Sequence, residues 1–288
     1  MVDSPRLIVN ADDFGLDPAV NAAVLSAHQG GILRSASLMV SAPAAAEAVA
    51  MAKAHPSLAV GLHLTLVDGE PVLPQEQVSA LVDASGRFAA DLWRRGFHYF
   101  FSPRAHRQLR AEIEAQFALF ADSGLCLDHA NAHKHLHAHP TVLRLMLAVG
   151  RRFGLRAVRV PREPLTMARQ LAPVGARAAL GARLLFPWVN RMQRFIRAQG
   201  FGCNDFLLGL LSTGQMDGER LHRALQILPA GSLTELYFHP AQEHSPRLRA
   251  LMPDYRPVAE WQGLLTLAPD ALGRHGIRWG SYGDFFPG

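Results

Sequence analysis

Short apolar runs alternate with helix-like stretches along this chain, and the alternation is the strongest constraint on its fold. The apolar runs cover residues 7–9, 36–40, 58–66, 125–130, 157–160 and 233–238. Stretches with helical spacing lie between several of them, at 17–30, 44–54, 104–123 and 140–153. Strands that alternate with helices favour a parallel sheet, either closed as a (β/α) barrel or open and doubly wound.

Polar side chains that can carry chemistry stand at the ends of different predicted strands. They are Asp12 and Asp13, His63, His133 and His239. A barrel gathers the C-terminal ends of its strands around one mouth, whereas an open sheet gathers only a few of them at a switch point. We therefore expect the α/β class with an irregular (β/α) barrel, TIM-barrel-like and with room for fewer than eight strands.

The length of 288 residues and the 49% hydrophobic content are sufficient for one α/β domain over 1–288. Residues 67–103 and 161–220 do not fit the alternation, because they are rich in proline, glycine and aromatic residues. We expect both to be insertions between strands and helices that lie over the C-terminal mouth of the barrel.

Positive charge is concentrated in one part of the chain. Residues 151–200 contain eleven arginines and one acidic residue, Glu163, although the net charge of the whole chain is only +5. Such a surface attracts nucleic acid, anionic lipid headgroups or a phosphorylated substrate, or it reflects a coding bias toward arginine on solvated helix faces. We do not expect nucleic acid as a partner.

Within this basic part, the sequence from Leu184 to Arg197 has the pattern of a basic amphipathic helix. A helix of this kind in residues 180–200 can rest on a membrane surface or cover an apolar substrate. The same pattern also occurs in helices that pack against their own core. Both alternatives remain open at the level of the sequence.

The chain shows no pattern for export or membrane insertion. Its N-terminus lacks the basic start and apolar stretch of a signal peptide, and no apolar run reaches the roughly 18 residues that span a bilayer. The two cysteines, Cys126 and Cys203, are far apart and have no metal-type spacing. We expect a cytoplasmic protein, with peripheral contact at the inner membrane face as a further hypothesis.

The acidic pair Asp12 and Asp13 is the first candidate for chemistry. At a turn that follows a strand, two neighbouring carboxylates can reach one cavity, where one binds a metal ion and the other acts as a base. The alternative is helix capping, which suits Asp17 before Pro18 better, because Asp12 and Asp13 lie too far upstream of that helix.

Histidines supply the second and third candidates. His63 lies inside an apolar run, and five histidines occupy alternate positions from His129 to His139, so that they would share one face of an extended segment. A solvated histidine-rich loop is the alternative for this block. One aspartate and two histidines from three strand ends form a common ligand set for a catalytic divalent metal, which predicts a metal-dependent hydrolase.

Three residues near the late strands extend this hypothesis. His239 ends the predicted strand 233–238 and is the natural general acid, and Glu235 is the candidate to orient it. Arg159 could hold a substrate oxygen, pair with a carboxylate of the site, or form an ordinary surface ion pair.

Five segments share their residues and order with a known family. They are 10–16 (Asn-Ala-Asp-Asp-Phe-Gly-Leu), 61–66 with Gly69 and Pro71, 129–137, 235–240 and the closing 279–284. In these segments the chain resembles the YdjC-like carbohydrate deacetylases. The resemblance implies an irregular (β/α) barrel and one divalent metal ion, magnesium or zinc, that helps to hydrolyse the N-acetyl group of an amino sugar.

Position by position, the resemblance assigns the metal ligands to Asp13, His63 and His133, with Asp12 as the base. Asn131 stands where the family usually has an aspartate, which removes one negative charge near the metal. His135 and His137 lie beside the site and are the next candidates for the acid if His239 does not serve. These seven assignments are implied by the resemblance and by neighbourhood in the sequence.

The Asn131 variant and the basic insertion also resemble the hopanoid-biosynthesis-associated branch of the family. This resemblance implies an N-acetylglucosaminyl lipid as substrate, with a chitooligosaccharide-like glycan as the broader class, and a homodimer is also compatible with it. Two other functions stay open. They are a metal-dependent phosphoesterase and a non-catalytic basic lipid-binding protein with structural histidines.

Overall fold

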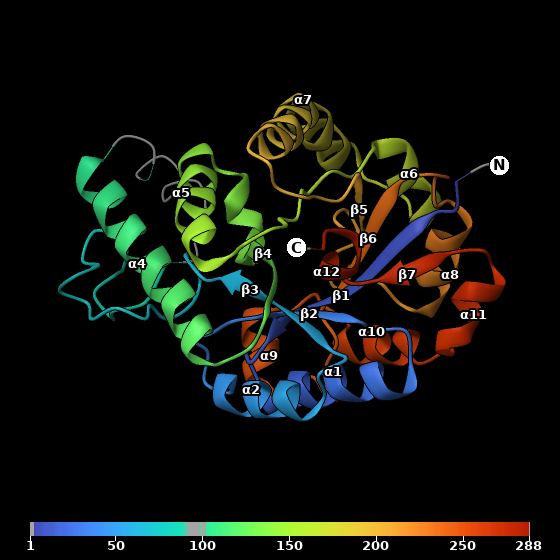
Figure 1. Ribbon diagram of the computed structural model, residues 1–288, viewed down its shortest axis with the longest axis horizontal. Coiled ribbons are helices and arrows are strands. Elements are labelled where there is room, and N and C mark those ends of the chain that lie inside the picture. Colours follow the sequence, from blue (N-terminus) through green and yellow to red (C-terminus); the bar gives the residue numbers. More distant parts are fainter. Residues whose placement is uncertain (1–2, 90, 92–98, 100–101, 288) are drawn as a thin grey trace.

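The computed structural model describes residues 3–89, 91, 99 and 102–287. These residues form a parallel sheet of seven strands, in the order β4-β3-β2-β1-β6-β5 with β7 paired to β1 (Figure 1). The strands are β1 (Arg6–Phe14), β2 (Ser35–Leu38), β3 (Ala59–Leu64), β4 (Leu127–Ala132), β5 (Phe206–Leu208), β6 (Leu233–Phe238) and β7 (Arg278–Gly280). Strand β1 is central, because it pairs with β2, β6 and β7.

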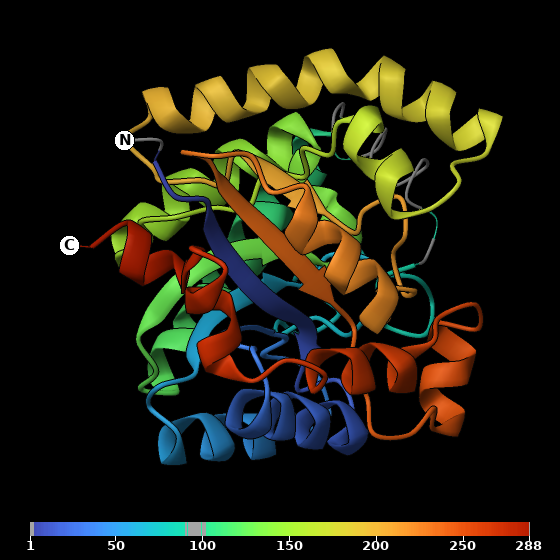
Figure 2. The ribbon, with the colours of Figure 1, turned by 90° about the vertical axis from the view of Figure 1, so that its right-hand side faces the viewer.

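Helices cover the sheet on its outer side (Figures 1 and 2). They are α1 (Pro18–Gly30), α2 (Ala45–Ala54), α4 (Pro103–Asp122), α5 (Pro140–Gly150), α6 (Leu165–Leu171), α7 (Ala176–Ala198), α8 (Gly218–Gln226), α9 (Pro246–Leu251), α10 (Pro257–Leu264), α11 (Pro269–Arg274) and α12 (Tyr282–Phe285), with the short 3-10 turns η1 (His133–Ala138) and η2 (Arg151–Phe153). The four helices predicted at 17–30, 44–54, 104–123 and 140–153 are confirmed as α1, α2, α4 and α5 with η2.

Local chemistry explains where these helices begin. Asp17 accepts a hydrogen bond of 2.9 Å from the backbone N–H of Ala19, and Pro18 occupies the first turn of α1. Ser102 caps α4 in the same way, with Pro103 as the first helical residue. A side-chain acceptor followed by proline satisfies a free N–H group and presets the backbone for a helix.

The sheet curls into a half-barrel. The predicted α/β class with parallel strands is confirmed, but the named strands leave the side between β4 and β5 open. Among the residues that the structure describes, two isolated bridges cross that side, Ala130 with Val158 and Ala157 with Gly202. The strand predicted at 157–160 is therefore reduced to bridge residues, and the closed barrel of the prediction is corrected to a half-barrel.

The central strands of the half-barrel are buried on both of their faces. Every residue of β1 from Leu7 to Phe14 is buried, as are all of β2 and all of β6. Parallel strands covered on both faces carry nearly continuous apolar runs, which is the pattern that located them in the sequence. The exceptions are polar residues inside the half-barrel, such as Asn10, Asp12 and Glu235.

The two predicted insertions differ in content. Residues 67–103 include positions outside the described part of the chain (90, 92–98 and 100–101), so that prediction is only partly open to comparison. Residues 161–220 are more regular than a loop, because they contain α6, α7, strand β5 and the start of α8. None of the described helices is both long and apolar enough to cross a membrane.

Helix α7 is the predicted amphipathic helix, and it lies on the outside of the molecule (Figure 2). On its inner side Met192 and Ile196 are fully buried, and the indole N–H of Trp188 donates a hydrogen bond of 2.8 Å to the backbone oxygen of Ala138. On its outer side Leu180 and Leu184 are exposed. The helix thus packs on the core and also presents an apolar face to solvent.

Candidate active site

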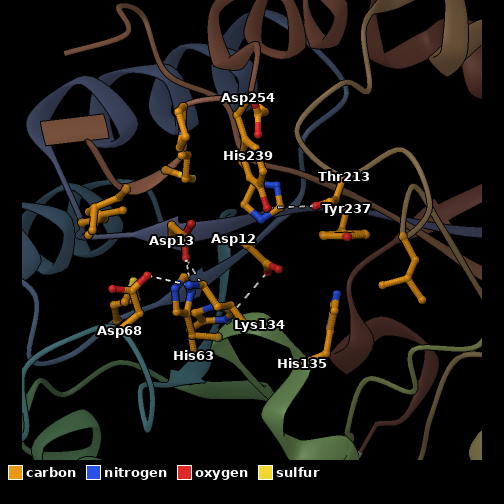
Figure 3. Close-up of a pocket in the computed structure, with 18 residues that line it drawn as sticks. Asp12, Asp13, His63, Asp68, Lys134, His135, Thr213, Tyr237, His239 and Asp254 are labelled. Atoms are coloured by element: carbon orange, nitrogen blue, oxygen red, sulfur yellow. Dashed lines mark hydrogen bonds and ion pairs between the residues drawn. The ribbon is translucent and has the colours of Figure 1, made fainter. Parts of the chain in front are cut away.

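The C-terminal ends of four parallel strands meet at one edge of the half-barrel. Asp12 and Asp13 come from the end of β1, His63 from β3, His133 from the residue after β4, and His239 from the residue after β6. These five side chains line a common pocket. Figure 3 shows Asp12 and Asp13 between the imidazoles of His63 and His239. Parallel topology places such residues together because all strand ends point to the same side.

Asp13, His63 and His133 form a compact cluster of three ligand-type side chains. One atom from each lies within 4.8 Å of the others. The Oδ1 atom of Asp13 is 3.3 Å from Nε2 of His63 and 3.1 Å from Nδ1 of His133. Asp13 and His63 are buried, whereas the His133 side chain is 13% exposed. The cluster is therefore reachable from one side only.

The cluster fits a divalent metal ion. Among the described residues, the buried Oδ2 atom of Asp13 has no hydrogen-bond partner. Burial opposes ionisation of Asp13, but His133 and His63 outweigh it and hold the pKa of the carboxyl well below its usual range. An ionised carboxylate with an unused oxygen beside two imidazoles is the donor set that zinc and related cations prefer.

The backbone around the pocket is held in an uncommon conformation. In the described part of the chain, four non-glycine residues have positive φ angles, namely Asp13 (61°), Asp68 (50°), Lys134 (50°) and His135 (53°), and all four line the pocket. Asp68 also accepts an ion-pair hydrogen bond of 2.6 Å from Lys134. Left-handed backbone costs energy in residues other than glycine and is concentrated at functional sites.

A buried arginine organises the carboxylates beneath the pocket. Arg159 is fully buried and binds Asp12 through two hydrogen bonds of 2.5 and 2.9 Å. It also donates to Glu235 at 2.7 Å, and the Tyr282 hydroxyl donates to the same carboxylate at 2.6 Å. Of the three roles predicted for Arg159, the pairing with a site carboxylate is the one observed, and its burial excludes a surface ion pair.

This arrangement sets the charge of Asp12. Burial opposes its ionisation, but the Arg159 guanidinium and His63 outweigh the effect, and the pKa of Asp12 lies well below its usual range. Asp12 is thus an anion at neutral pH, fixed in orientation by a bidentate ion pair.

His239 stands on the opposite side of the pocket from His63. Its ring packs edge-on against Tyr237 and Tyr255, with centroid distances of 5.4 and 5.0 Å, and burial lowers its pKa. Its backbone N–H donates to Glu260, whereas Glu235, the residue predicted to orient it, is bonded to Arg159 and Tyr282. Sequence reasoning missed Glu260, because no motif marks it within α10.

The histidine block does not form one extended face. After Ala132 the chain turns into η1, and the five imidazoles point to different surroundings. His129 is buried below the site, bonded to Asp128 and Ser37 at 2.9 and 3.0 Å. His137 is also buried, and its Nε2–H donates to the backbone oxygen of Arg159 at 3.0 Å.

Of the remaining predicted residues, His135 lines the pocket and Asn131 lies behind His63. Burial lowers the pKa of His135 well below its usual range, and it lowers the pKa of His137 to about 3. Both imidazoles are therefore neutral at pH 7. Asn131 is fully buried, with its amide 2.6 Å from Nδ1 of His63.

The pocket has a volume of about 440 Å³ and a mixed lining. The polar groups are the residues described above, together with Thr213 and Asp254. The remaining wall is mainly apolar and is made by Leu16, Met39, Leu210, Leu251, Met252, Pro253 and Tyr255. A concave apolar wall around a few convergent polar groups is typical of a small-molecule site.

Fold and site together define an α/β half-barrel protein with a carboxylate–imidazole cluster at the C-terminal ends of its strands. The family model described as YdjC-like protein matches residues 6–268. The chain therefore belongs to the YdjC-like family.

Individual relatives agree with this assignment. The chain is 40% identical to a carbohydrate deacetylase of Brevibacillus brevis over 54% of its own length and 59% of that protein. It is 33% identical to a carbohydrate deacetylase of Mus musculus over 84% of its own length and 79% of that protein. The matched part thus spans about three fifths of the Brevibacillus relative.

A solved structure shares the whole fold. It is a crystal structure from Enterococcus faecalis V583, described as that of a candidate cellobiose-phosphate cleavage protein. The two structures agree with a TM-score of 0.73 and 25% identity, over 98% of this chain and 99% of the other.

Proposed function

We propose that this protein is a metal-dependent hydrolase that removes the acetyl group from the nitrogen of an acetylated amino sugar. The observation that carries the proposal is the cluster of Asp13, His63 and His133 within 4.8 Å, with Asp12 and His239 on the same pocket. The carbohydrate deacetylases among its relatives support the choice of substrate class.

Asp13, His63 and His133 would hold one divalent cation, magnesium or zinc, which when bound polarises the acetyl carbonyl and makes the attacking water more acidic. Asp12 accepts the proton of that water. Arg159 and His63 keep the pKa of Asp12 low, so the carboxylate is ionised and free to accept the proton, and it is a weak base. His239 faces the same pocket and delivers a proton to the leaving nitrogen, so acetate and a free amine are formed.

Burial acts on the role of His239 in two ways. The lowered pKa reduces the fraction of His239 that is protonated near neutral pH, and it makes the protonated imidazole a stronger acid, which favours proton transfer to the nitrogen as the C–N bond breaks. Glu260 accepts from its backbone N–H and fixes the start of the segment after β6. Tyr237 and Tyr255 limit the rotation of the ring from both sides.

Single substitutions separate the metal ligands from the acid. We expect Asp13→Ala and His63→Ala to lose bound metal and acetate release together, because each removes a ligand. His239→Ala should keep the metal and lose about 100-fold or more of the turnover, which is typical for loss of a general acid. Metal content by mass spectrometry and acetate release from N-acetylglucosamine oligomers are the measurements. Full activity of the His239 variant would assign the acid to another group.

We further propose that the natural substrate carries an apolar group, as in an N-acetylglucosaminyl lipid of the hopanoid type. The apolar wall made by Leu16, Met39, Leu210 and Leu251 supports this, because a free sugar has little surface to bury there. Mass-spectrometric comparison of such a lipid with chitooligosaccharides tests it. A higher kcat/KM for the water-soluble glycan would contradict the lipid.

We also propose that the enzyme works in the cytoplasm and that α7 rests on the inner membrane face. Leu180, Leu184 and Leu185 are exposed by 59%, 71% and 58%, and four exposed arginines of the same helix flank them, Arg177, Arg183, Arg191 and Arg194. Apolar residues between cationic groups suit anionic lipid headgroups. The arginines oppose close packing of a second copy on this face.

Vesicle co-sedimentation tests this contact. We expect binding to vesicles that contain phosphatidylglycerol and little binding to pure phosphatidylcholine. Leu184→Gln should weaken binding several-fold, whereas Leu119→Gln on α4, which is 39% exposed, should not. Equal binding of both variants would contradict the contact, and a dimer that the Leu184 change dissociates would assign the face to a second copy.

A metal-dependent phosphoesterase is the second candidate. The observation in its favour is that the Enterococcus structure with the same fold is described as a candidate cellobiose-phosphate cleavage protein, a description that names a phosphorylated sugar and not the bond that is cleaved. Phosphate release from sugar phosphates without acetate release from N-acetylated sugars would select this function.

A further inference from the structure

The Asn131 side chain lies between a candidate metal ligand and a fixed arginine. Its amide is fully buried on β4, and one of its two end atoms is 2.6 Å from Nδ1 of His63. The other end atom is 2.9 Å from the Ser37 hydroxyl and 3.0 and 3.1 Å from the Nη1 and Nη2 atoms of Arg159. An amide has one acceptor end and one donor end, so its orientation decides which neighbour is satisfied.

In one orientation, the carbonyl of Asn131 faces Arg159. It then accepts hydrogen bonds from the guanidinium and from Ser37, and its NH₂ group donates to Nδ1 of His63. These three contacts pair a donor with an acceptor, whereas the carbonyl also lies 3.3 Å from Oδ1 of Asp12, which is a second acceptor. A neutral His63 that accepts at Nδ1 carries its hydrogen on Nε2, the atom that faces Asp13 at 3.3 Å. A nitrogen that carries a hydrogen has no lone pair for a cation.

In the other orientation, the carbonyl faces His63 and accepts the Nδ1–H at 2.6 Å. The Nε2 atom is then free to bind a cation together with Asp13 and His133. The NH₂ group then donates to the Ser37 hydroxyl at 2.9 Å and to Oδ1 of Asp12 at 3.3 Å, but it also points at the N–H groups of Arg159 at 3.0 and 3.1 Å. Arg159 cannot turn away, because Asp12 and Glu235 hold it with hydrogen bonds of 2.5 to 3.1 Å. Two buried donors that face each other destabilise this state.

We propose that Asn131 limits the affinity of the cluster for divalent cations, because its carbonyl must turn from Arg159 to His63 before Nε2 of His63 can bind. The inference rests on the metal-binding role proposed above and adds a positioning residue to it. An aspartate at 131 would present an acceptor oxygen to both neighbours. Asn131→Asp should therefore tighten cation binding by about 10- to 100-fold, the usual range for a change in the partner of a histidine ligand.

Cation titration of the purified chain tests the effect, with Zn²⁺ alone as the probe. The control is Asn10→Asp, because Asn10 bonds to Asp12 and Ser37 at 3.0 Å each and has no bond with His63. The control adds the same charge to the same buried group of side chains. We expect tighter binding for Asn131→Asp only. Equal tightening in both variants would mean that charge alone acts, and it would overturn the inference.

Nitrogen-15 NMR of the metal-free protein supplies an independent readout, recorded at a pH above the titration of His63 itself, because Asp12 and Asp13 outweigh burial and raise the pKa of this imidazole. We expect the His63 hydrogen on Nε2 in the unaltered chain and on Nδ1 in Asn131→Asp, with His63→Gln used to assign the signals. A hydrogen on Nδ1 in the unaltered chain would overturn the inference. Neither readout needs acetate release, so failure of the proposed reaction is seen separately.

Discussion

Arg159 shows how one residue can fix the chemistry of several others. Its side chain is fully buried between Asp12 and Glu235. Its guanidinium carbon lies over the Tyr237 ring, 5.0 Å from the centroid of that ring. Burying three charged groups is unfavourable unless each is paired, and here all are. The same contacts hold Asp12 ionised and keep its carboxylate in one orientation.

Replacing Arg159 by methionine should therefore destabilise the whole chain. The substitution keeps much of the side-chain volume but leaves Asp12 and Glu235 buried without a cation, so we expect a loss of about 3 to 5 kcal/mol in the free energy of unfolding. Urea denaturation measures it. Arg191→Met, on the exposed side of α7, is the control. An unchanged denaturation midpoint for Arg159→Met would contradict the role assigned to the buried pairs.

Among the elements, the segment after β5 is fastened at both ends by buried carboxyl groups. Glu163 accepts hydrogen bonds from the backbone N–H groups of Gly209 and Leu211 at 2.9 and 2.6 Å. Glu260 accepts from Met216 at 2.8 Å. Burial raises the pKa of each carboxyl to about 7. Leu210 and Thr213 of this segment line the pocket, so its anchoring shapes the site.

These raised pKa values predict a pH dependence of stability. A carboxyl whose pKa is higher in the folded state stabilises the fold fully below its unfolded pKa of 4.5, and this contribution is lost as pH rises through about 7. We expect the contribution of each carboxyl to the free energy of unfolding to fall between pH 5 and 8, by at most about 3 kcal/mol. The buried histidines, whose pKa values are lowered, act in the opposite direction, so each variant is compared with the unaltered chain. Glu163→Gln should flatten the decline, and Glu219→Gln on the surface should not. If the free energy of unfolding changed with pH in the same way in the unaltered chain, in Glu163→Gln and in Glu219→Gln, the raised pKa of Glu163 would be refuted.

The elements also show what sequence patterns could predict. Long amphipathic stretches gave α1, α2, α4 and α5 within three residues, because their periodicity covers several turns. Strands β5 and β7 were not predicted, since three residues are too few for any period to be visible. The run 157–160 looked like a strand, yet only isolated bridges form there before Pro161, which has no N–H to donate.

The candidate ligands were predictable because aspartates and histidines at strand ends are unusual among apolar residues. The residues that hold the site residues in place could not be predicted in this way. Ser37 and Glu260 are ordinary in sequence, and they reach the site only because β2 lies next to β1 and α10 lies beside the end of β6. Arg159 and Asp12 are 147 positions apart, and the order of the strands in the sheet brings them together. Local sequence patterns carry no information on that order.

On the scale of the whole molecule, the cluster joins distant parts of the chain. Asp13, His63 and His133 come from β1, β3 and the residue after β4, and 120 positions separate the first from the last. Any cation that binds all three in the folded state, and not in the unfolded chain, stabilises the fold by linkage. A cation bound there would thus stabilise the fold as well as serve the proposed chemistry.

A thermal measurement follows from this linkage. At a free Zn²⁺ concentration of about 100 times Kd, we expect a gain of about 2.7 kcal/mol in the free energy of unfolding and a higher Tm. His63→Ala should show no such gain, because the cluster is then incomplete. Calorimetry with and without chelator measures both. An equal rise in Tm for His63→Ala would place the stabilising cation elsewhere.

The open side of the half-barrel has a consequence for how such proteins diverge. Between β4 and β5 the described backbone is joined by the pairs Ala130 with Val158 and Ala157 with Gly202 and by the hydrogen bond from the Leu207 N–H to the Arg162 oxygen, so a change of chain length there disrupts few ladder bonds. The candidate ligands lie on β1, β3 and the turn after β4, outside this seam. Arg159 lies within the seam and holds Asp12, so insertions and deletions there are compatible with the candidate site only where this residue keeps its place.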